Sequence, residues 1–178
     1  MDMEKKIKIG PTGTNDPDNH LLMNWDDGGR GDISYIFLSF NDTGIISIQF
    51  QYVKDGKPFL TDRYGSGYTA DTFETIELKY PEEYLTRIGG EYSSELVQQY
   101  GSFKDPHVRM IKFSTNLAEY GPYGGRRGYS QKGFAFGLGK SPRQFGGFHG
   151  SYDSRGLHSI GVYLFPKTPW EESDITLG

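Results

Sequence analysis

The feature that most restricts the fold of this chain is an alternation of apolar and polar residues with a period of two. It is clearest at residues 32–40 and 45–53, which flank the turn sequence Asn41-Asp-Thr-Gly44, and a second turn at Asp55-Gly56 leads into residues 57–60. Successive side chains of a strand point to opposite faces, so such alternation marks strands with one buried face. Gly, Asn and Asp are the residues that tight turns select. These residues therefore predict an antiparallel meander of three strands.

Further segments repeat this pattern between turn residues, and the chain contains 25 Gly, 13 Tyr and 12 Phe. Aromatic-rich strands joined by many glycine turns are typical of all-β proteins. The only helix-compatible run, residues 94–99, is too short to be stable without tertiary support, and a long loop explains it as well. We therefore predict an all-β fold, either a sandwich, a barrel or a radial repeat of sheets. The further segments are residues 6–9, 73–80, 84–89, 107–114, 133–139, 145–150 and 157–165.

Composition excludes several functional classes. The chain has no cysteine, which rules out disulfides, thiolate-bound metals and a thiol nucleophile. Its 19 basic and 23 acidic residues are scattered, with a net charge of -4, so there is no basic footprint for nucleic acid. No apolar run reaches the length that a signal peptide or a membrane span requires. We expect a cytoplasmic protein that binds neither nucleic acid nor membrane and uses no cofactor.

The chain length fits one domain with its own core, which we place at residues 5–165. Residues 166–178 contain two prolines and a cluster of acids without strand alternation. This composition predicts a mobile acidic tail, in which Trp170 is the one candidate anchor.

Residues that could perform catalysis lack the necessary arrangement. Glu82 and Glu83 are neighbours, whose side chains would point apart on an extended chain, and we interpret them as part of a solvated turn. There is no Gly-x-Ser-x-Gly nucleophile elbow. Residues 120–133 mix Gly, Arg and Tyr, which can bind anions or single-stranded RNA, although a long hairpin loop explains them as well. The four histidines lack the spacing of His-based zinc motifs, so no metal site and no enzyme is predicted. They are His20, His107, His149 and His158.

Seven short segments occur in the order and at about the spacing found in one protein family. They are Ile9-Gly-Pro11, Asn24-Trp-Asp-Asp-Gly28, Pro81-Glu-Glu-Tyr-Leu85, Val108-Arg-Met-Ile-Lys-Phe-Ser-Thr-Asn116, Tyr120-Gly-Pro-Tyr-Gly124, Gly146-Gly-Phe-His-Gly150 and Ser159-Ile-Gly-Val-Tyr163. In these segments the chain resembles the jacalin-related lectins of plants, from about Ile7 to Phe165. The resemblance implies a type I β-prism, in which three four-stranded Greek-key sheets surround a pseudo-threefold axis.

Two further segments, Ile48-Gln-Phe-Gln51 and Leu138-Gly-Lys-Ser-Pro142, are similar to those of a jacalin-type protein that restricts the long-distance movement of potyviruses in plant phloem. The resemblance therefore implies a carbohydrate-binding lectin of antiviral defence, and also self-association, since the family is often oligomeric.

The resemblance also implies where a sugar would bind. In this family the Asp of a Gly-x-x-x-Asp loop accepts hydrogen bonds from adjacent sugar hydroxyls, and a glycine in the N-terminal loop leaves room for the ring. Here Ser154 stands at the loop Gly, His158 at the Asp, and Leu22 at the N-terminal Gly. Neutral His has one acceptor nitrogen, and Leu22 would crowd the sugar. A mannose- or glucose-type ligand is therefore expected to bind weakly, in the millimolar range, or not at all.

Asp153 offers a substitute carboxylate, because it is the only acid between Gly146 and Phe165 and the loop is one residue longer than usual. Tyr152 could provide a ring face and Arg155 a hydrogen-bond donor. The alternative is that Asp153 only accepts backbone N–H groups in an Asx turn. The candidate site is completed by two glycines, Gly13 and Gly156.

Two functions therefore remain open. The first is a defence lectin with a degenerate sugar site. The second is a protein-interaction module, in which the prism persists, the sugar site is vestigial, and the loops bind viral or host movement factors.

Overall fold

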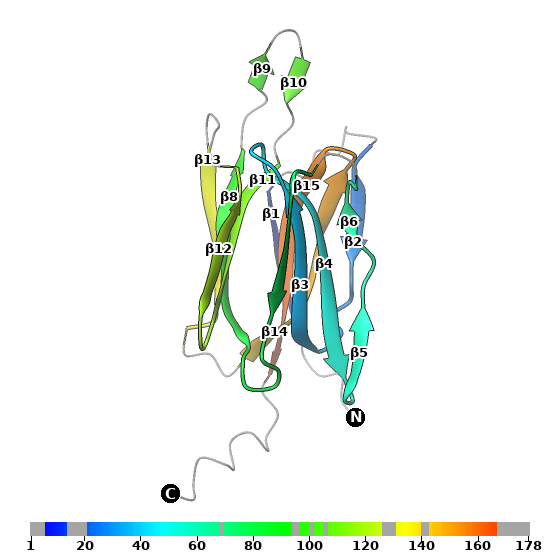
Figure 1. Cartoon of the computed structure of the whole chain (residues 1–178), viewed down its shortest axis with the longest axis vertical. Coiled ribbons are helices and arrows are strands. Elements are labelled where there is room, and N and C mark those ends of the chain that lie inside the picture. The colour runs from blue at the N-terminus through cyan, green and yellow to red at the C-terminus, as the bar shows by residue number, and fades with distance from the viewer. Residues whose placement is uncertain are drawn as a thin grey trace, which may run out of the picture.

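The structure, a computed structural model, describes residues 6–13, 21–67, 70–93, 97–99, 102–104, 107–125, 131–139 and 143–166. All fifteen elements in these ranges are strands. None of the described segments is a helix that could cross a membrane. The predicted all-β fold is confirmed, and Figure 1 shows the strands standing roughly side by side along the long axis of the molecule.

Sheet A joins the two ends of the described chain. Its order is β1-β15-β14-β2, and all neighbours are antiparallel. The strands are β1 (Ile7–Gly13), β15 (Gly156–Pro166), β14 (Arg143–Asp153) and β2 (Met23–Asp26).

Sheet B contains the predicted meander. Its order is β5-β4-β3-β7, and the short β6 pairs with β4 beyond the end of β5. The strands are β5 (Lys57–Leu60), β4 (Ile45–Lys54), β3 (Asp32–Phe40), β7 (Thr72–Glu77) and β6 (Tyr64–Gly65).

Sheet C has the order β12-β11-β8-β13. A separate hairpin, β9 with β10, extends beyond the sheet at one end of the molecule (Figure 1). The strands are β12 (Glu119–Gly124), β11 (Val108–Thr115), β8 (Leu85–Ser93), β13 (Gln131–Gly137), β9 (Val97–Gln99) and β10 (Ser102–Lys104).

The three sheets share one topology. In each, two central strands are flanked by one outer strand on either side, and in sheets B and C the chain order across the sheet is the 4-1-2-3 of a Greek key. In sheet A the outer strands β1 and β2 come from the start of the chain and the central strands β14 and β15 from its end. The two ends of the described chain together complete the four-stranded pattern. The predicted prism of three Greek-key sheets is confirmed.

A β-bulge interrupts the central pair of every sheet near the same end of the prism. The extra residue of the bulge is His158 in sheet A, Ile46 in sheet B and Arg109 in sheet C, and all three are buried. Bulges of this kind are fixed parts of a fold because they bend the strand and re-aim a side chain.

A glycine of an outer strand crosses each bulge. A Cβ atom would lie 2.3, 2.1 and 2.2 Å from the carbonyl oxygen of the bulge residue, far inside van der Waals contact. All three glycines have a positive φ. Only glycine fits such a close approach with that backbone conformation. The glycines are Gly13, Gly65 and Gly124.

The core lies between the inner faces of the sheets and is aliphatic and aromatic. The rings of Phe50 and Phe148 stack across sheets B and A with centroids 4.1 Å apart, and Trp25 stacks on Tyr64 at 4.2 Å. Such contacts exclude water over the length of the prism, and area burial of this kind is the main favourable contribution to folding.

One buried carboxylate, Asp27, holds the chain between β2 and β3 against sheet A. It accepts hydrogen bonds from the hydroxyl of Tyr52 and from the N–H groups of Phe148 (2.9 Å) and Gly29 (3.2 Å). Burial raises the pKa of Asp27, because every donor is neutral and desolvation is only partly offset.

Three expectations need correction. Residues 97–99, predicted as helix or loop, form a strand, since β9 pairs with β10. Glu83, predicted on a solvated turn, is 2% exposed and accepts hydrogen bonds from Thr115 and Tyr120, while Glu82 is exposed. Residues 120–124 are strand β12 and not loop. Residues 14–20 with His20, residues 126–130, and residues 167–178 with Trp170 lie outside the described residues.

Candidate functional site

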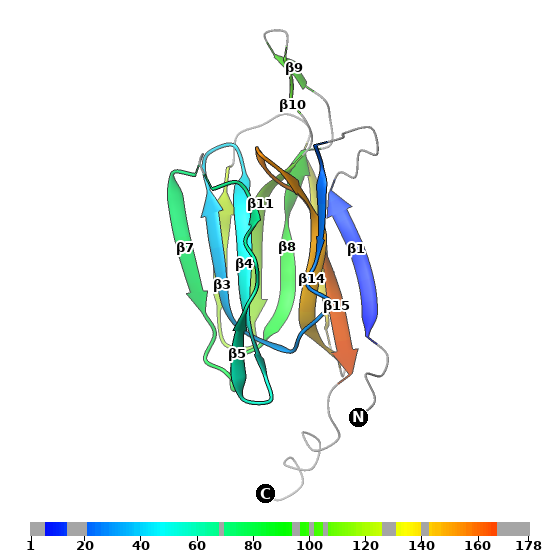
Figure 2. The same ribbon diagram turned by 90° about the vertical axis from the view of Figure 1, so that its right-hand side faces the viewer.

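The candidate residues gather at one end of sheet A. Strand β1 ends there at Gly13, β2 begins there at Met23, and the hairpin of β14 and β15 turns there (Figure 2). The register pairs Gly13 with Ser159 and Tyr152 with Met23. Leu22 directly precedes β2 and is half-buried. The topology therefore brings all eight predicted residues to the same end of one sheet.

Asp153 is the centre of this group, and its side chain is 1% exposed. Its Oδ1 accepts the backbone N–H of Arg155 at 2.7 Å, which forms the predicted Asx turn. Its Oδ2 accepts Nε–H of Arg155 at 3.0 Å, a second guanidinium N–H at Nη2, and Nε2–H of His158 at 3.0 Å. The carboxylate is thus bonded to groups of its own turn.

These contacts determine the charge state of Asp153. Burial alone would raise its pKa, but the hydrogen bonds from His158 and Arg155 outweigh burial and hold the pKa well below the usual range of an aspartate. Asp153 is therefore ionised at neutral pH.

The remaining residues of the turn differ in exposure. Ser154 and Arg155 face solvent, whereas Gly156 and His158 are buried. Tyr152 is half-buried, with its ring 6.5 Å from that of Tyr64. An open polar rim over a buried carboxylate is a geometry in which a polyhydroxyl ligand could meet several hydrogen-bonding groups.

Gly13 has a structural explanation that does not involve a ligand. It crosses the carbonyl oxygen of His158 in the same way as Gly65 and Gly124 cross the equivalent carbonyls of sheets B and C. The glycine at this position is therefore required by the fold in all three sheets.

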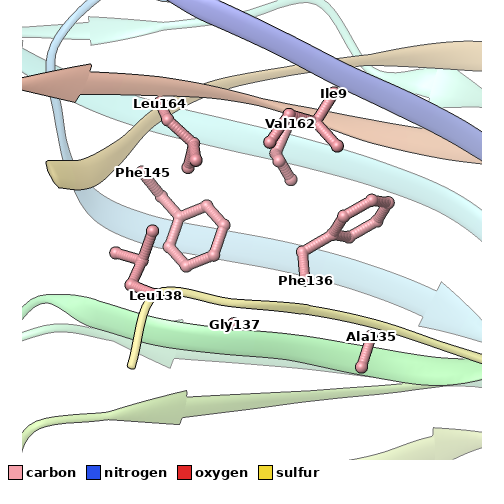
Figure 3. A pocket seen from close by; sticks show the side chains of 8 residues that line it. All are labelled: Ile9, Ala135, Phe136, Gly137, Leu138, Phe145, Val162 and Leu164. Carbon is pink, nitrogen blue, oxygen red and sulfur yellow. The ribbon is translucent and has the colours of Figure 1, made fainter. Parts of the chain in front are cut away.

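A groove of about 190 Å³ between sheets A and C is the contrasting surface (Figure 3). Two phenyl rings, of Phe136 and Phe145, stand on either side of it, and Figure 3 shows no charged side chain in its walls. It lacks the hydrogen-bonding side chains that orient a sugar, so the turn of β14 and β15 is the better candidate for a sugar site. The lining residues are Ile9, Ala135, Phe136, Gly137, Leu138, Phe145, Val162 and Leu164.

Other ionisable groups have structural partners. Nε2 of His149 lies 3.0 Å from the carbonyl oxygen of Ile9, and burial lowers the pKa of His149. Among the described residues, no group of three or more His, Asp or Glu side chains is placed to hold a metal ion.

The contact between Asp153 and His158, 3.0 Å from Oδ2 to Nε2, was not predicted from the sequence. The signal was available: the two residues flank a short glycine-containing turn in a predicted hairpin, which places them close together.

Comparison with known proteins gives the same assignment. The model of the jacalin-like lectin domain matches residues 10–163. The chain is 53% identical to Protein RESTRICTED TEV MOVEMENT 1 of Arabidopsis thaliana, over 91% of this chain and 88% of that protein. It is 45% identical to Jacalin-related lectin 2 of the same plant, over 92% and 89% of the two chains.

Solved lectin structures share the fold. The artocarpin–mannotriose complex has a TM-score of 0.74 and 28% identity, covering 90% of this chain and 98% of artocarpin. Single-chain recombinant jacalin also has a TM-score of 0.74 and 28% identity, over 91% and 95% of the chains. With the domain match, the relatives and the prism in agreement, this chain belongs to the family of jacalin-like lectins.

Proposed function

We propose that this protein is a non-enzymatic lectin of plant antiviral defence that restricts virus movement, and that its sugar site, at the turn of β14 and β15, is degenerate. The antiviral role is supported by the 53% identity with a protein named for restricted virus movement. The degenerate site is supported by one observation: the only carboxylate of the turn, Asp153, is bonded on both oxygens by its own turn. The protein acts in the cytoplasm and needs no cofactor.

The expected affinity follows from these bonds. When the site offers no free carboxylate, a bound sugar loses charge-assisted hydrogen bonds worth about 1.5–3 kcal/mol each. Loss of two weakens binding by about a hundredfold or more, which puts a mannose- or glucose-type ligand in the millimolar range.

Calorimetric titration with methyl glycosides of mannose, glucose and galactose tests this proposal, together with a glycan array. We expect millimolar affinity at best. Micromolar affinity of the unaltered protein would contradict the degenerate site.

Restoring the family's carboxylate is the matching gain-of-function test. His158→Asp alone would place two carboxylates together, because His158 Nε2 lies 3.0 Å from Asp153. The variant should therefore combine His158→Asp with Asp153→Asn and Leu22→Gly, and it is expected to bind mannose more strongly than the unaltered protein.

A protein-interaction module is the second candidate, and a surface of sheet B favours it. Phe73 is 69% and Leu60 53% exposed, and the stacked rings of Tyr35 and Phe37 lie on the same outer face. Exposed apolar clusters of this kind often bind proteins, either a viral or host factor or a second copy of the chain.

Two variants separate these functions in a plant virus-movement assay. Asp153→Asn should abolish restriction if the sugar site acts, and Phe73→Ser should abolish it if the face of sheet B acts. Light scattering of Phe73→Ser tests self-association through this face, since a dimer that uses Phe73 would dissociate.

A further inference from the structure

We propose that Arg155 is a latch that closes the sugar site, so that its guanidinium occupies the carboxylate of Asp153 in place of sugar hydroxyls. This inference rests on the proposed sugar site and concerns how that site opens.

The carboxylate of Asp153 already accepts hydrogen bonds from several donors. An ionised carboxylate has about four lone-pair sites, and it cannot donate. Four N–H groups point at Asp153: three from Arg155, namely its backbone N, Nε and Nη2, and one from His158. Three of these donors fill Oδ2, and the carboxylate is 1% exposed. The vicinal hydroxyls of a sugar therefore cannot reach it until one of these donors moves away.

Exposure identifies which donor can move. The side chain of Arg155 is 51% exposed, while that of His158 is 2% exposed and lies in the bulge of β15. Moving His158 would disturb the core, whereas the guanidinium can rotate into water. A half-exposed ion pair is also worth little, because water screens it. Arg155 is therefore the removable cover of a carboxylate that is otherwise part of the fold.

The equivalent hairpin of sheet B shows that the turn itself does not need this cover. There Asn41 replaces Asp153, and its Oδ1 accepts the N–H of Thr43 at 2.8 Å, as Asp153 accepts that of Arg155. Both hairpins have the bulge at the same place, and each contains a Ser–Ser hydrogen bond of 2.6 Å. At the position of Arg155 sheet B has Thr43, whose hydroxyl donates to Oδ1 of Asn41 at 2.6 Å. The same turn therefore forms with a short neutral donor and does not need a guanidinium.

The geometry also specifies the ligand class. The two guanidinium N–H groups on Oδ2 of Asp153 form a fork, and two adjacent hydroxyls of a neutral hexose can donate to a carboxylate in a comparable way. A ligand of this kind can replace the side chain of Arg155 at Asp153. The backbone N–H of Arg155 and the side chain of His158 keep their hydrogen bonds to the carboxylate.

Calorimetric titration of Arg155→Ala with the methyl glycosides of mannose, glucose and galactose tests the latch. We expect at least a tenfold gain in affinity for one of them relative to the unaltered protein. The gain should disappear in Arg155→Ala/Asp153→Asn, which removes the carboxylate. Arg87→Ala is the charge-matched control, because it removes an exposed arginine from another sheet, on β8. It should leave the affinity unchanged.

A second measurement does not depend on sugar. The pKa of the Asp153 carboxyl, followed by NMR, should rise in Arg155→Ala towards the ordinary value, because the guanidinium and its two N–H donors are lost. If Arg155→Ala does not fold, Arg155→Lys serves, since it keeps the charge without the fork and should give a smaller gain.

Each outcome decides something different. Millimolar binding that stays the same in a folded Arg155→Ala overturns the latch and leaves the proposed weak lectin intact. Micromolar binding by the unaltered protein overturns both. If neither the protein nor any variant binds the three sugars, the latch and the sugar site both fail, and the interaction module remains.

Discussion

The hairpin of β14 and β15 in sheet A and the hairpin of β3 and β4 in sheet B have the same backbone but different side chains. At the buried bulge position sheet A has His158 and sheet B has Ile46, and at the first turn position they have Asp153 and Asn41. Gly156 and Gly44 follow with φ values of 152° and 158°. The fold therefore requires an Asx side chain, a glycine and a filled bulge, and a neutral set of residues meets these requirements.

The difference bears on why sheet A has Asp153 and His158 in its hairpin. Burying Asp153 and His158 requires desolvation, and replacing such a pair by apolar or neutral groups is often harmless to stability or even favourable. Because Asn41 and Ile46 occupy the equivalent positions of sheet B, the fold itself does not require Asp153 and His158 there. A binding role for the charged hairpin is the simplest explanation.

In both hairpins a glycine of an outer strand approaches the carbonyl oxygen of the bulge residue, and replacing this glycine should reduce stability most. Gly13→Ala and Gly65→Ala should each reduce the free energy of unfolding by about 3 kcal/mol or more, because the new Cβ would overlap a carbonyl oxygen and the φ is positive. Urea denaturation measures both.

Gly56→Ala is the control, since its φ is also positive but nothing lies within 4 Å of the Cβ position. A Gly13→Ala protein that is as stable as this control, with only ligand binding lost, would show that Gly13 serves the ligand and not the fold.

The next effect tests whether Asp153 and His158 can be replaced together. His158→Ile alone should destabilise the protein by about 2 kcal/mol, because it leaves buried Asp153 short of a hydrogen-bond donor. Asp153→Asn/His158→Ile, which copies Asn41 and Ile46, should recover most of that loss. A double-mutant cycle by urea denaturation gives the coupling energy. Additive losses would contradict the equivalence of the two hairpins.

A smaller effect should appear as a function of pH. The folded-state pKa of Asp153 is depressed below the ordinary value of an aspartate, so its ionisation stabilises the fold above about pH 4. This contribution is lost as the pH falls below that value towards the folded-state pKa. The unaltered protein should therefore be more stable than Asp153→Asn at pH 7 by about 1–2 kcal/mol.

The gap between the two proteins should narrow progressively below pH 4, because the protonated Asp153 then resembles Asn. Thermal unfolding at a series of pH values measures it. Asn41→Ala, which weakens the other turn without removing a charge, should give a difference from the unaltered protein that does not change over this range.

The comparison also shows what could be predicted from the sequence. Alternation and turn residues were sufficient to predict the strands at residues 32–40 and 45–53. A strand with one solvent-facing and one buried face alternates polar and apolar residues with a period of two. The ordered motifs were sufficient to predict the prism. The helix or loop expected at residues 94–99 was wrong at 97–99, since a three-residue strand is too short to show alternation.

Burial at the site could not be predicted in the same way. Glu83 was expected on a solvated turn, since charged residues usually lie at the surface, and the residues around Asp153 do not indicate how deeply it is buried. Glu83 is buried where Thr115 and Tyr120 donate to it from β11 and β12, contacts that depend on the tertiary fold. Asp153 is buried with donors from its own hairpin, Arg155 and His158. The glycine at 13 was identified as a candidate, but its reason emerged only when Gly65 and Gly124 were seen at equivalent positions.

The smallest effect concerns the third member of the series, Arg109, at the bulge position of sheet C. The side chain is 8% exposed, and its Nε has no hydrogen-bond partner. Burial lowers the pKa of Arg109, although the charges of Asp42 and Glu91 act in the opposite direction.

An unsatisfied buried donor costs about 1–3 kcal/mol, and Ile46 shows that an apolar side chain fits the same backbone position. Arg109→Met should therefore stabilise the protein by about 1 kcal/mol in urea denaturation, allowing for lost attraction to the two acids. Arg87→Met, at an exposed position, should change stability by less than about 0.5 kcal/mol. If Arg109→Met is instead destabilising, the guanidinium has a stabilising role that its position does not reveal, and the three bulge positions do not follow one rule. A gain would mean that charge at the bulge is optional in sheet C, and that His158 in sheet A is retained for its contact with Asp153.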